Sequence, residues 1–301
     1  MPTRLRPGSV GYLAELALLL LLATLWGASY SFIRVGVESI PPISFIAART
    51  TIAAVVLLGV LRARRLAMPT DLALWRRFLF QACLNSVIPY TLIAWAERSV
   101  DAGLATILNS SAPIFAFVLT WCLGRRQFVA GRQLFGVVSG MIGIVLIVGV
   151  QALFGVGDQL TAELAIVLAT VCYAGAAIFG RSFHGLDPML PATGSLLCGA
   201  IVLVPLGLIV DHPWPIVPST RSIIALLCLS IFSTALALTI YFRLIQTLGA
   251  VGATSQAYLR VPIGVAIGVT FLGESLAPTT WIGLLCVIAG VAAMTLPASA
   301  R

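Results

Sequence analysis

The sequence contains no lysine, and only 9% of its residues are charged. A soluble globular domain is about a quarter charged, so this chain cannot cover a water-exposed surface with polar groups. Hydrophobic residues make up 60% of the chain, and the mean hydropathy is +1.07. The shortage of charge therefore excludes an ordinary soluble protein, and a lipid bilayer is the expected surrounding.

Several chemical signatures are also missing. Without lysine there is no P-loop G-x-x-x-x-G-K-[ST], which argues against an ATP-driven pump. No H-E-x-x-H motif and no C-x-x-C pair occurs, so the sequence predicts no metal site, no cofactor and no catalytic residue. The net charge of +8 comes from arginines in short loops, which indicates membrane orientation rather than a nucleic-acid partner.

What is present is a series of ten apolar runs. Backbone groups in lipid must hydrogen-bond internally, so each run is predicted to be a helix. The runs lie near 14–33, 43–61, 78–96, 102–122, 133–150, 163–181, 190–210, 222–242, 252–272 and 279–296. With the N-terminus inside, thirteen arginines fall on the cytoplasmic side and three on the outer side. This bias predicts an all-α integral membrane protein with ten transmembrane helices and both termini cytoplasmic.

The second half of the chain repeats features of the first. A shift of 149 residues aligns 102–124 with 251–273, and Pro113 then matches Pro262. After a two-residue slip, "GVVSGMIG" at 136–143 lies over "GLLCVIAG" at 283–290. Five helices in each half would force the halves into opposite orientations. The sequence thus predicts two inverted five-helix repeats, 1–150 and 151–301, an architecture with its substrate site between the halves.

The motifs "TLWGASYSFIR", "PPISFIAAR" and "FLGESLAPTTWIGLLCVIAGVAAM" resemble those of the EamA family in the drug/metabolite transporter superfamily. The resemblance covers nearly the whole chain, and its most specific part is the ending at 272–290. It implies a ten-helix carrier, usually an exporter of amino acids, other small metabolites or toxic compounds. One position departs from the family pattern: Glu274 follows "LG" in the second half, but Arg125 stands there in the first. Glu274 is therefore expected to have a structural role.

Arg260, in "AYLRVP", is the most unusual residue of the apolar runs. It lies about 12 Å into its helix, and Pro262 interrupts the backbone hydrogen bonds nearby. A cation beside a broken helix suits recognition of an anionic or carboxylate-bearing substrate. A structural arginine, paired to carbonyls or to a carboxylate of another helix, is an equal alternative.

Other polar or aromatic side chains within the runs are secondary candidates. Arg49 is expected to extend to the outer surface or to pair with Glu38 or Glu97. The remaining cavity candidates are Gln256, Tyr258, Asn109, Asn85, Trp26, Tyr30, Tyr173 and Tyr241, with Pro113 and Pro262 as helix breaks. Hydrogen bonds between helices, membrane-interface belts and ordinary packing are the alternatives for these side chains.

These features predict a secondary transporter of the bacterial plasma (inner) membrane that works by alternating access. The expected partners are the bilayer and a small-molecule substrate. A receptor or scaffold is one alternative, although the loops offer it little binding surface. An intramembrane enzyme is another, but it would need a nucleophile with a base, or a metal site, and neither pattern is present.

Overall fold

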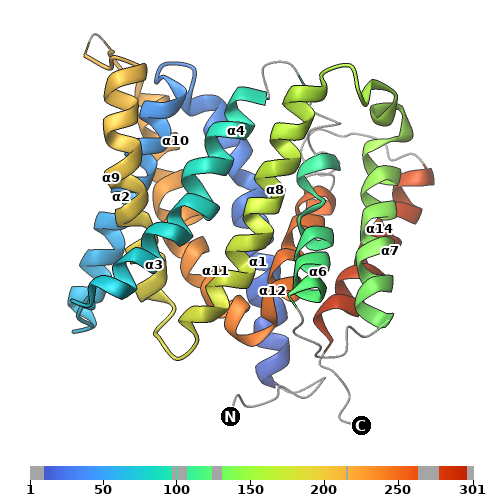
Figure 1. Ribbon diagram of the computed structural model, residues 1–301. Helices are drawn as coiled ribbons and strands as arrows, with labels where there is room; N and C mark the ends of the chain where they lie inside the picture. Colours follow the sequence, from blue (N-terminus) through green and yellow to red (C-terminus); the bar gives the residue numbers. More distant parts are fainter. Residues whose placement is uncertain are drawn as a thin grey trace.

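The computed structural model describes residues 10–96, 100, 107–123, 131–214, 216–263 and 278–296. Within these ranges the chain is helical, and no strand occurs. Figure 1 shows the helices arranged side by side. Helices suit a protein that crosses lipid, because each satisfies its backbone hydrogen bonds internally. Glu97, Arg125 and Glu274, on which three of the sequence interpretations rest, lie outside the described residues.

The helices follow one another in a regular order. The first half of the described chain contains α1 (Val10–Gly36), α2 (Pro42–Ala63), α3 (Leu72–Ala82), α4 (Ile88–Ala96), α6 (Ala112–Cys122) and α7 (Gly131–Val148). The second half contains α8 (Leu160–Gly180), α9 (Met189–Val210), α10 (Thr220–Ser230), α11 (Ala237–Thr247), α12 (Gly249–Thr254) and α14 (Pro278–Thr295). Two π-helical segments, η1 (Cys83–Val87) and η4 (Ile231–Leu236), join α3 to α4 and α10 to α11. Two 3-10 segments, η2 (Val150–Gly155) and η3 (Arg181–Phe183), precede and follow α8.

In the described part of the chain, seven helices are long and apolar enough to cross a membrane. They cover Gly11–Ser29, Pro42–Ala63, Gly131–Val148, Leu160–Phe183, Met189–Val210, Thr220–Thr247 and Pro278–Thr295. Seven of the ten predicted runs are matched in this way. The other three correspond to interrupted or shorter helical stretches at 72–96, 107–122 and 249–263.

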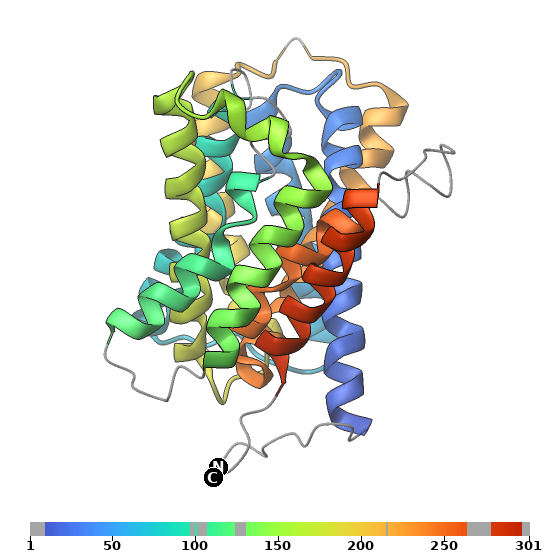
Figure 2. The same ribbon diagram turned by 90° about the vertical axis from the view of Figure 1, so that its right-hand side faces the viewer.

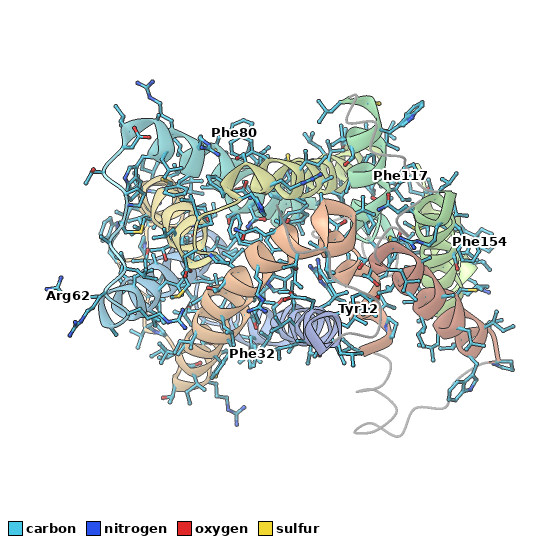
Figure 3. All side chains as sticks on the ribbon, turned by 90° about the horizontal axis from the view of Figure 1, so that it is seen from below. Tyr12, Phe32, Arg62, Phe80, Phe117 and Phe154 are labelled. Atoms are coloured by element: carbon cyan, nitrogen blue, oxygen red, sulfur yellow. The ribbon has the colours of Figure 1, made fainter. Side chains whose placement is uncertain are left out.

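The outer surface of the bundle is apolar. Phe80, Ile201 and Leu285 are 51%, 70% and 69% exposed, and Figure 3 shows Phe80 and Phe154 at the periphery. Soluble monomers rarely expose large contiguous apolar patches. Because lipid chains cover such side chains, this surface fits the bilayer that the composition predicts.

Helices α7 and α14 lie side by side (Figure 2) and approach through two glycine pairs. A Cβ atom on Gly136 would lie 2.7 Å from the carbonyl oxygen of Gly290, and one on Gly143 would lie 2.7 Å from that of Gly283. The repeat alignment equates Gly136 with Gly283 and Gly143 with Gly290. Replacing each glycine by its repeat counterpart therefore turns one contact into the other, which is the pattern of a two-fold related interface. Small residues permit such close backbone contact in membranes.

The π-helical segments also occupy corresponding places in the two halves. Asn85 in η1 and Thr234 in η4 are 149 positions apart, the same offset that aligns the repeat prolines. Asn85 is 5% exposed and Thr234 is 3% exposed. A π-helical turn changes the helical register locally and is frequent at functional sites. In both halves, then, a local distortion places a small polar side chain in the interior.

Candidate functional site

An interior cavity of about 260 Å³ is formed by residues from both halves of the chain. This volume lies just below the range of about 300–1,000 Å³ that holds drug-sized ligands, so the cavity suits a small metabolite. Its polar lining comprises Trp26, Ser29, Arg49, Asn85, Tyr90, Asn109, Tyr173, Tyr241, Thr254, Gln256 and Arg260. Apolar side chains, among them Ile33, Phe45 and Ile93, complete the wall.

One face of α1 forms a wall of this cavity. Trp26, Ser29, Ile33 and Val37 all line it, and their spacing of three or four residues places them on one side of a helix. The lining reaches the α1–α2 turn at Val37 and Pro42. The cavity therefore extends from the middle of α1 toward the C-terminal end of that helix.

Arg260 is held in the cavity wall by two neighbours. Its Nε donates to the side-chain oxygen of Gln256 at 2.7 Å, one turn earlier on the same helix. Its guanidinium carbon lies 5.0 Å from the ring centroid of Trp26, a cation–π distance. Trp26 is itself fixed, because its Nε1 donates to the carbonyl of Ser233 at 3.1 Å and its ring packs against that of Tyr241, with 5.3 Å between the ring centroids.

Arg49 differs from its prediction. It neither reaches the surface nor depends on a carboxylate of the described residues, since it is 5% exposed and its Nε donates to Thr234 Oγ1 at 2.6 Å. Its guanidinium lies 5.1 Å from the ring centroid of Tyr90. The physical reason is that α2 presents Arg49 to the interior, where the η4 distortion supplies a hydroxyl acceptor. The sequence indicated an unusual charge here but gave no sign of this partner.

Most of the predicted cavity residues are brought together. Beside Tyr258 and Tyr30, the predicted candidates included six residues that do lie in the lining, namely Arg260, Gln256, Asn109, Asn85, Trp26 and Tyr173. They come from five helical segments that are far apart in the sequence. Tyr241, also considered from the sequence, lines the cavity as well. Arg49, Tyr90 and Thr254 were missed as lining residues, and only Arg49 carried a signal, an isolated charge in an apolar run.

Tyr258 lies elsewhere than predicted. It is fully buried, and its hydroxyl donates to the carbonyl of Val137 at 3.1 Å. Its ring lies against Gly140 and fills the space that any larger residue at position 140 would need. It therefore anchors its helix to α7 rather than facing the cavity. Tyr30 belongs to α1, but its side chain is outside the described part of the structure.

The two predicted helix breaks differ from each other. In the first half a turn at Ser110–Ser111 directly precedes α6, and Pro113 occupies the first turn of that helix, where a missing N–H is tolerated. In the second half the irregular position is Ser255, which separates α12 from the helical residues 256–263. Pro262 lies seven positions after Ser255, next to the end of the described stretch at residue 263, and a break there stays a prediction. Gln256 and Arg260 lie in the first turns after Ser255.

The charge of the cavity is unbalanced. Its described lining contains two guanidinium groups, from Arg49 and Arg260, and no aspartate or glutamate. Positive charge in a low-dielectric wall attracts anions strongly. Chemically, the site can bind and orient an anionic group while the aromatic rings enclose an apolar part of the ligand.

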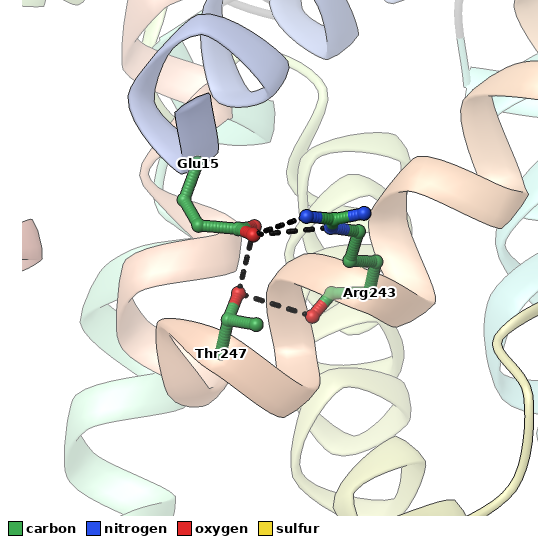
Figure 4. A network of polar contacts seen from close by, with 3 residues as sticks. All are labelled: Glu15, Arg243 and Thr247. Carbon is green, nitrogen blue, oxygen red and sulfur yellow. Dashed lines mark hydrogen bonds and ion pairs between the residues drawn. The ribbon is translucent and has the colours of Figure 1, made fainter. Parts of the chain in front are cut away.

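A separate polar network joins α1 to α11 at the other end of α1 (Figure 4). The Glu15 side chain is 4% exposed and accepts from Arg243 Nε at 3.0 Å and Nη2 at 2.8 Å. Thr247 Oγ1 donates to the second carboxylate oxygen at 3.0 Å. Glu15 precedes Trp26 by three helical turns, or about 16 Å along the axis. This network therefore fastens the two helices together well away from the cavity.

The fold defines a multi-pass helical membrane protein, and residues of both halves line its cavity. The chain belongs to the EamA-like transporter family, whose profile matches residues 13–149 and 160–296. It is therefore a membrane transporter of the drug/metabolite type, located in the inner (plasma) membrane.

Similar proteins agree with this family. The uncharacterized inner membrane transporter YedA of Escherichia coli K12 is 26% identical over 91% of this chain and 88% of its own length. The uncharacterized transporter YoaV of Bacillus subtilis is 24% identical over 92% and 95%. A probable terminal-alkyne amino-acid exporter of Streptantibioticus cattleyicolor is 25% identical over 91% and 90%. A solved crystal structure with 18% identity has a TM-score of 0.77 and covers 96% of this chain and 99% of that one, which shows a shared fold.

Proposed function

We propose that this protein is a secondary transporter that exports a small carboxylate-bearing metabolite, such as an amino acid or a related compound. The observation that carries the proposal is Arg260, a cation oriented by Gln256 and Trp26 in the wall of a metabolite-sized cavity. A guanidinium recognises a carboxylate through paired hydrogen bonds. The similarity to a probable amino-acid exporter supports the same substrate class and direction.

The proposed topology is ten transmembrane helices with both termini in the cytoplasm, in two inverted five-helix repeats, 1–150 and 151–301. The first turn of α1 and the last turn of α14 lie at the same end of the molecule (Figure 1), as an even number of crossings requires. The two family matches, the reciprocal glycine contacts and the paired π-helices support the repeats. Reporter fusions at the C-terminus test the orientation, and a periplasmic C-terminus would contradict it.

Alternating access gives each polar site a role in this scheme. With the N-terminus in the cytoplasm, the cavity extends toward the outer side through the α1–α2 turn. The Glu15–Arg243–Thr247 network then lies on the cytoplasmic side, where it holds α1 against α11. This arrangement corresponds to an outward-facing state, in which a substrate released from the cavity leaves the cell.

The direct test is substrate flux. The purified protein is reconstituted in liposomes, and a panel of radiolabelled amino acids and organic acids is assayed by counterflow for wild type and for Arg260→Gln. Arg221→Gln is the matched control, because Arg221 is an exposed residue in the first turn of α10. Uptake of the transported compound into inverted membrane vesicles then tests the export direction.

The expected result is flux of at least one carboxylate compound by wild type and Arg221→Gln, and a strong loss in Arg260→Gln. Normal flux in a folded Arg260→Gln variant would refute the role of Arg260. Flux only of compounds without a carboxylate would refute the substrate class. No flux by wild type with any compound would favour a receptor or scaffold.

A further inference from the structure

Arg49 gives the cavity a second cation, and this one is buried. Among the described residues its partners are the neutral hydroxyl of Thr234 and the ring of Tyr90, and neither brings a negative charge. A buried charge is strongly unfavourable unless it is paired and hydrogen-bonded. Arg49 is 5% exposed, so water compensates little of its charge.

The two guanidinium groups are held in the same manner by different elements. Arg260 is bonded through Nε to Gln256 and stacked on Trp26, while Arg49 is bonded through Nε to Thr234 and stacked on Tyr90. An arginine has five N–H donors, and Nε supplies only one of them. In each case the described residues bond only the Nε. The two terminal nitrogens, which form paired hydrogen bonds with a carboxylate, can then bind a ligand.

The two arginines share the described cavity lining with aromatic side chains and with no acidic one. The Trp26 ring, which carries Arg260, packs against Tyr241, and both rings line the cavity. Aromatic walls suit the short carbon skeleton of a metabolite. A ligand with one carboxylate would neutralise one guanidinium and leave the other without a counter-charge, whereas a ligand with two anionic groups would neutralise both.

We propose that the cavity selects substrates that carry two anionic groups, such as dicarboxylates, with one group bound by Arg260 and the other by Arg49. The inference rests on the proposed transport function and narrows its substrate class. The small volume of about 260 Å³ limits the ligand to a short spacer between the two groups. Arg49 is then a specificity-determining residue, and Thr234 positions it.

The test uses pairs of compounds that share a carbon skeleton and differ by one carboxylate. Succinate is compared with butyrate, and glutamate with 2-aminopentanoate, in proteoliposome counterflow. Wild type, Arg49→Gln and the exposed-site control Arg221→Gln are assayed together, and thermal unfolding checks that each is folded. Because a charge-assisted hydrogen bond contributes enough for about a tenfold change in affinity, wild type is expected to prefer the two-carboxylate member by at least about tenfold.

Arg49→Gln is expected to lower that preference to near unity, whereas Arg221→Gln is expected to keep it. Wild type transporting both members equally, or preferring the one-carboxylate member, would overturn the inference while leaving carboxylate export in place. An unchanged preference in folded Arg49→Gln would also overturn it. If the variant does not fold, the wild-type selectivity decides alone. Absence of flux for every compound, in contrast, refutes the proposed function itself.

Discussion

Replacing Gly290 by alanine is expected to force α7 and α14 apart. The added Cβ would lie 2.7 Å from the carbonyl oxygen of Gly136 and 2.7 Å from the backbone nitrogen of Gly140. Both are backbone atoms, which no side-chain rotation can move. Ordinary contact begins at 3.4 Å, so the helices must separate by about 0.7 Å. Overpacking of this kind costs about 1–3 kcal/mol.

The assay is thermal unfolding of the purified protein in one detergent. Gly59→Ala is the matched control, because Gly59 lies within α2 and nothing stands within 4 Å of its built Cβ. There alanine is favoured over glycine by about 0.5–1 kcal/mol, so the control should melt at or slightly above the wild-type temperature. If Gly290→Ala melts as high as the control, the glycine contact is not formed as described, and the two-fold packing of the repeats loses its main support.

Three further substitutions test the polar contacts. Arg243→Gln leaves the buried Glu15 carboxylate without its cation. Breaking a buried pair costs about 3–5 kcal/mol, and because Arg243 is half exposed we expect a smaller loss of unfolding free energy in a denaturant titration. Adding Glu15→Gln should recover part of this loss. Equal stability of Arg243→Gln and wild type would argue against this network. Thr234→Val removes the acceptor that positions Arg49, so the preference for two-carboxylate compounds should fall by up to about tenfold in counterflow; an unchanged preference would show that Thr234 has no such role. Trp26→Leu removes a cation–π contact of about 0.5–2 kcal/mol, so competition assays should show carboxylate binding weakened about threefold or more. A Trp26→Leu variant that binds carboxylates as tightly as wild type would be inconsistent with the stacking.

Much of this architecture follows from the sequence. Hydropathy predicted the long helices, because an apolar run of about 20 residues in lipid can satisfy its backbone only as a helix. The shift of 149 residues identified the matching prolines, and the same shift relates the two π-helices. Arg260 was identifiable because an isolated charge in such a run requires an interior partner or a ligand.

Other features depend on contacts between distant segments and leave no local signal. The partner of Arg49 is Thr234, on a helix distorted in a way that residue spacing does not predict. Tyr258 could be placed on a helix, but its packing against Gly140 is set by the approach of α7. The break at Ser255, too, could not be located from Pro262 alone.

The central claim is that Arg260 binds the carboxylate of a transported substrate. It is tested most directly by counterflow of the carboxylate panel in proteoliposomes containing wild type, Arg260→Gln or the control Arg221→Gln. The account predicts flux by wild type and the control, and flux at least about tenfold lower in a folded Arg260→Gln variant. Equal flux by all three proteins would contradict it.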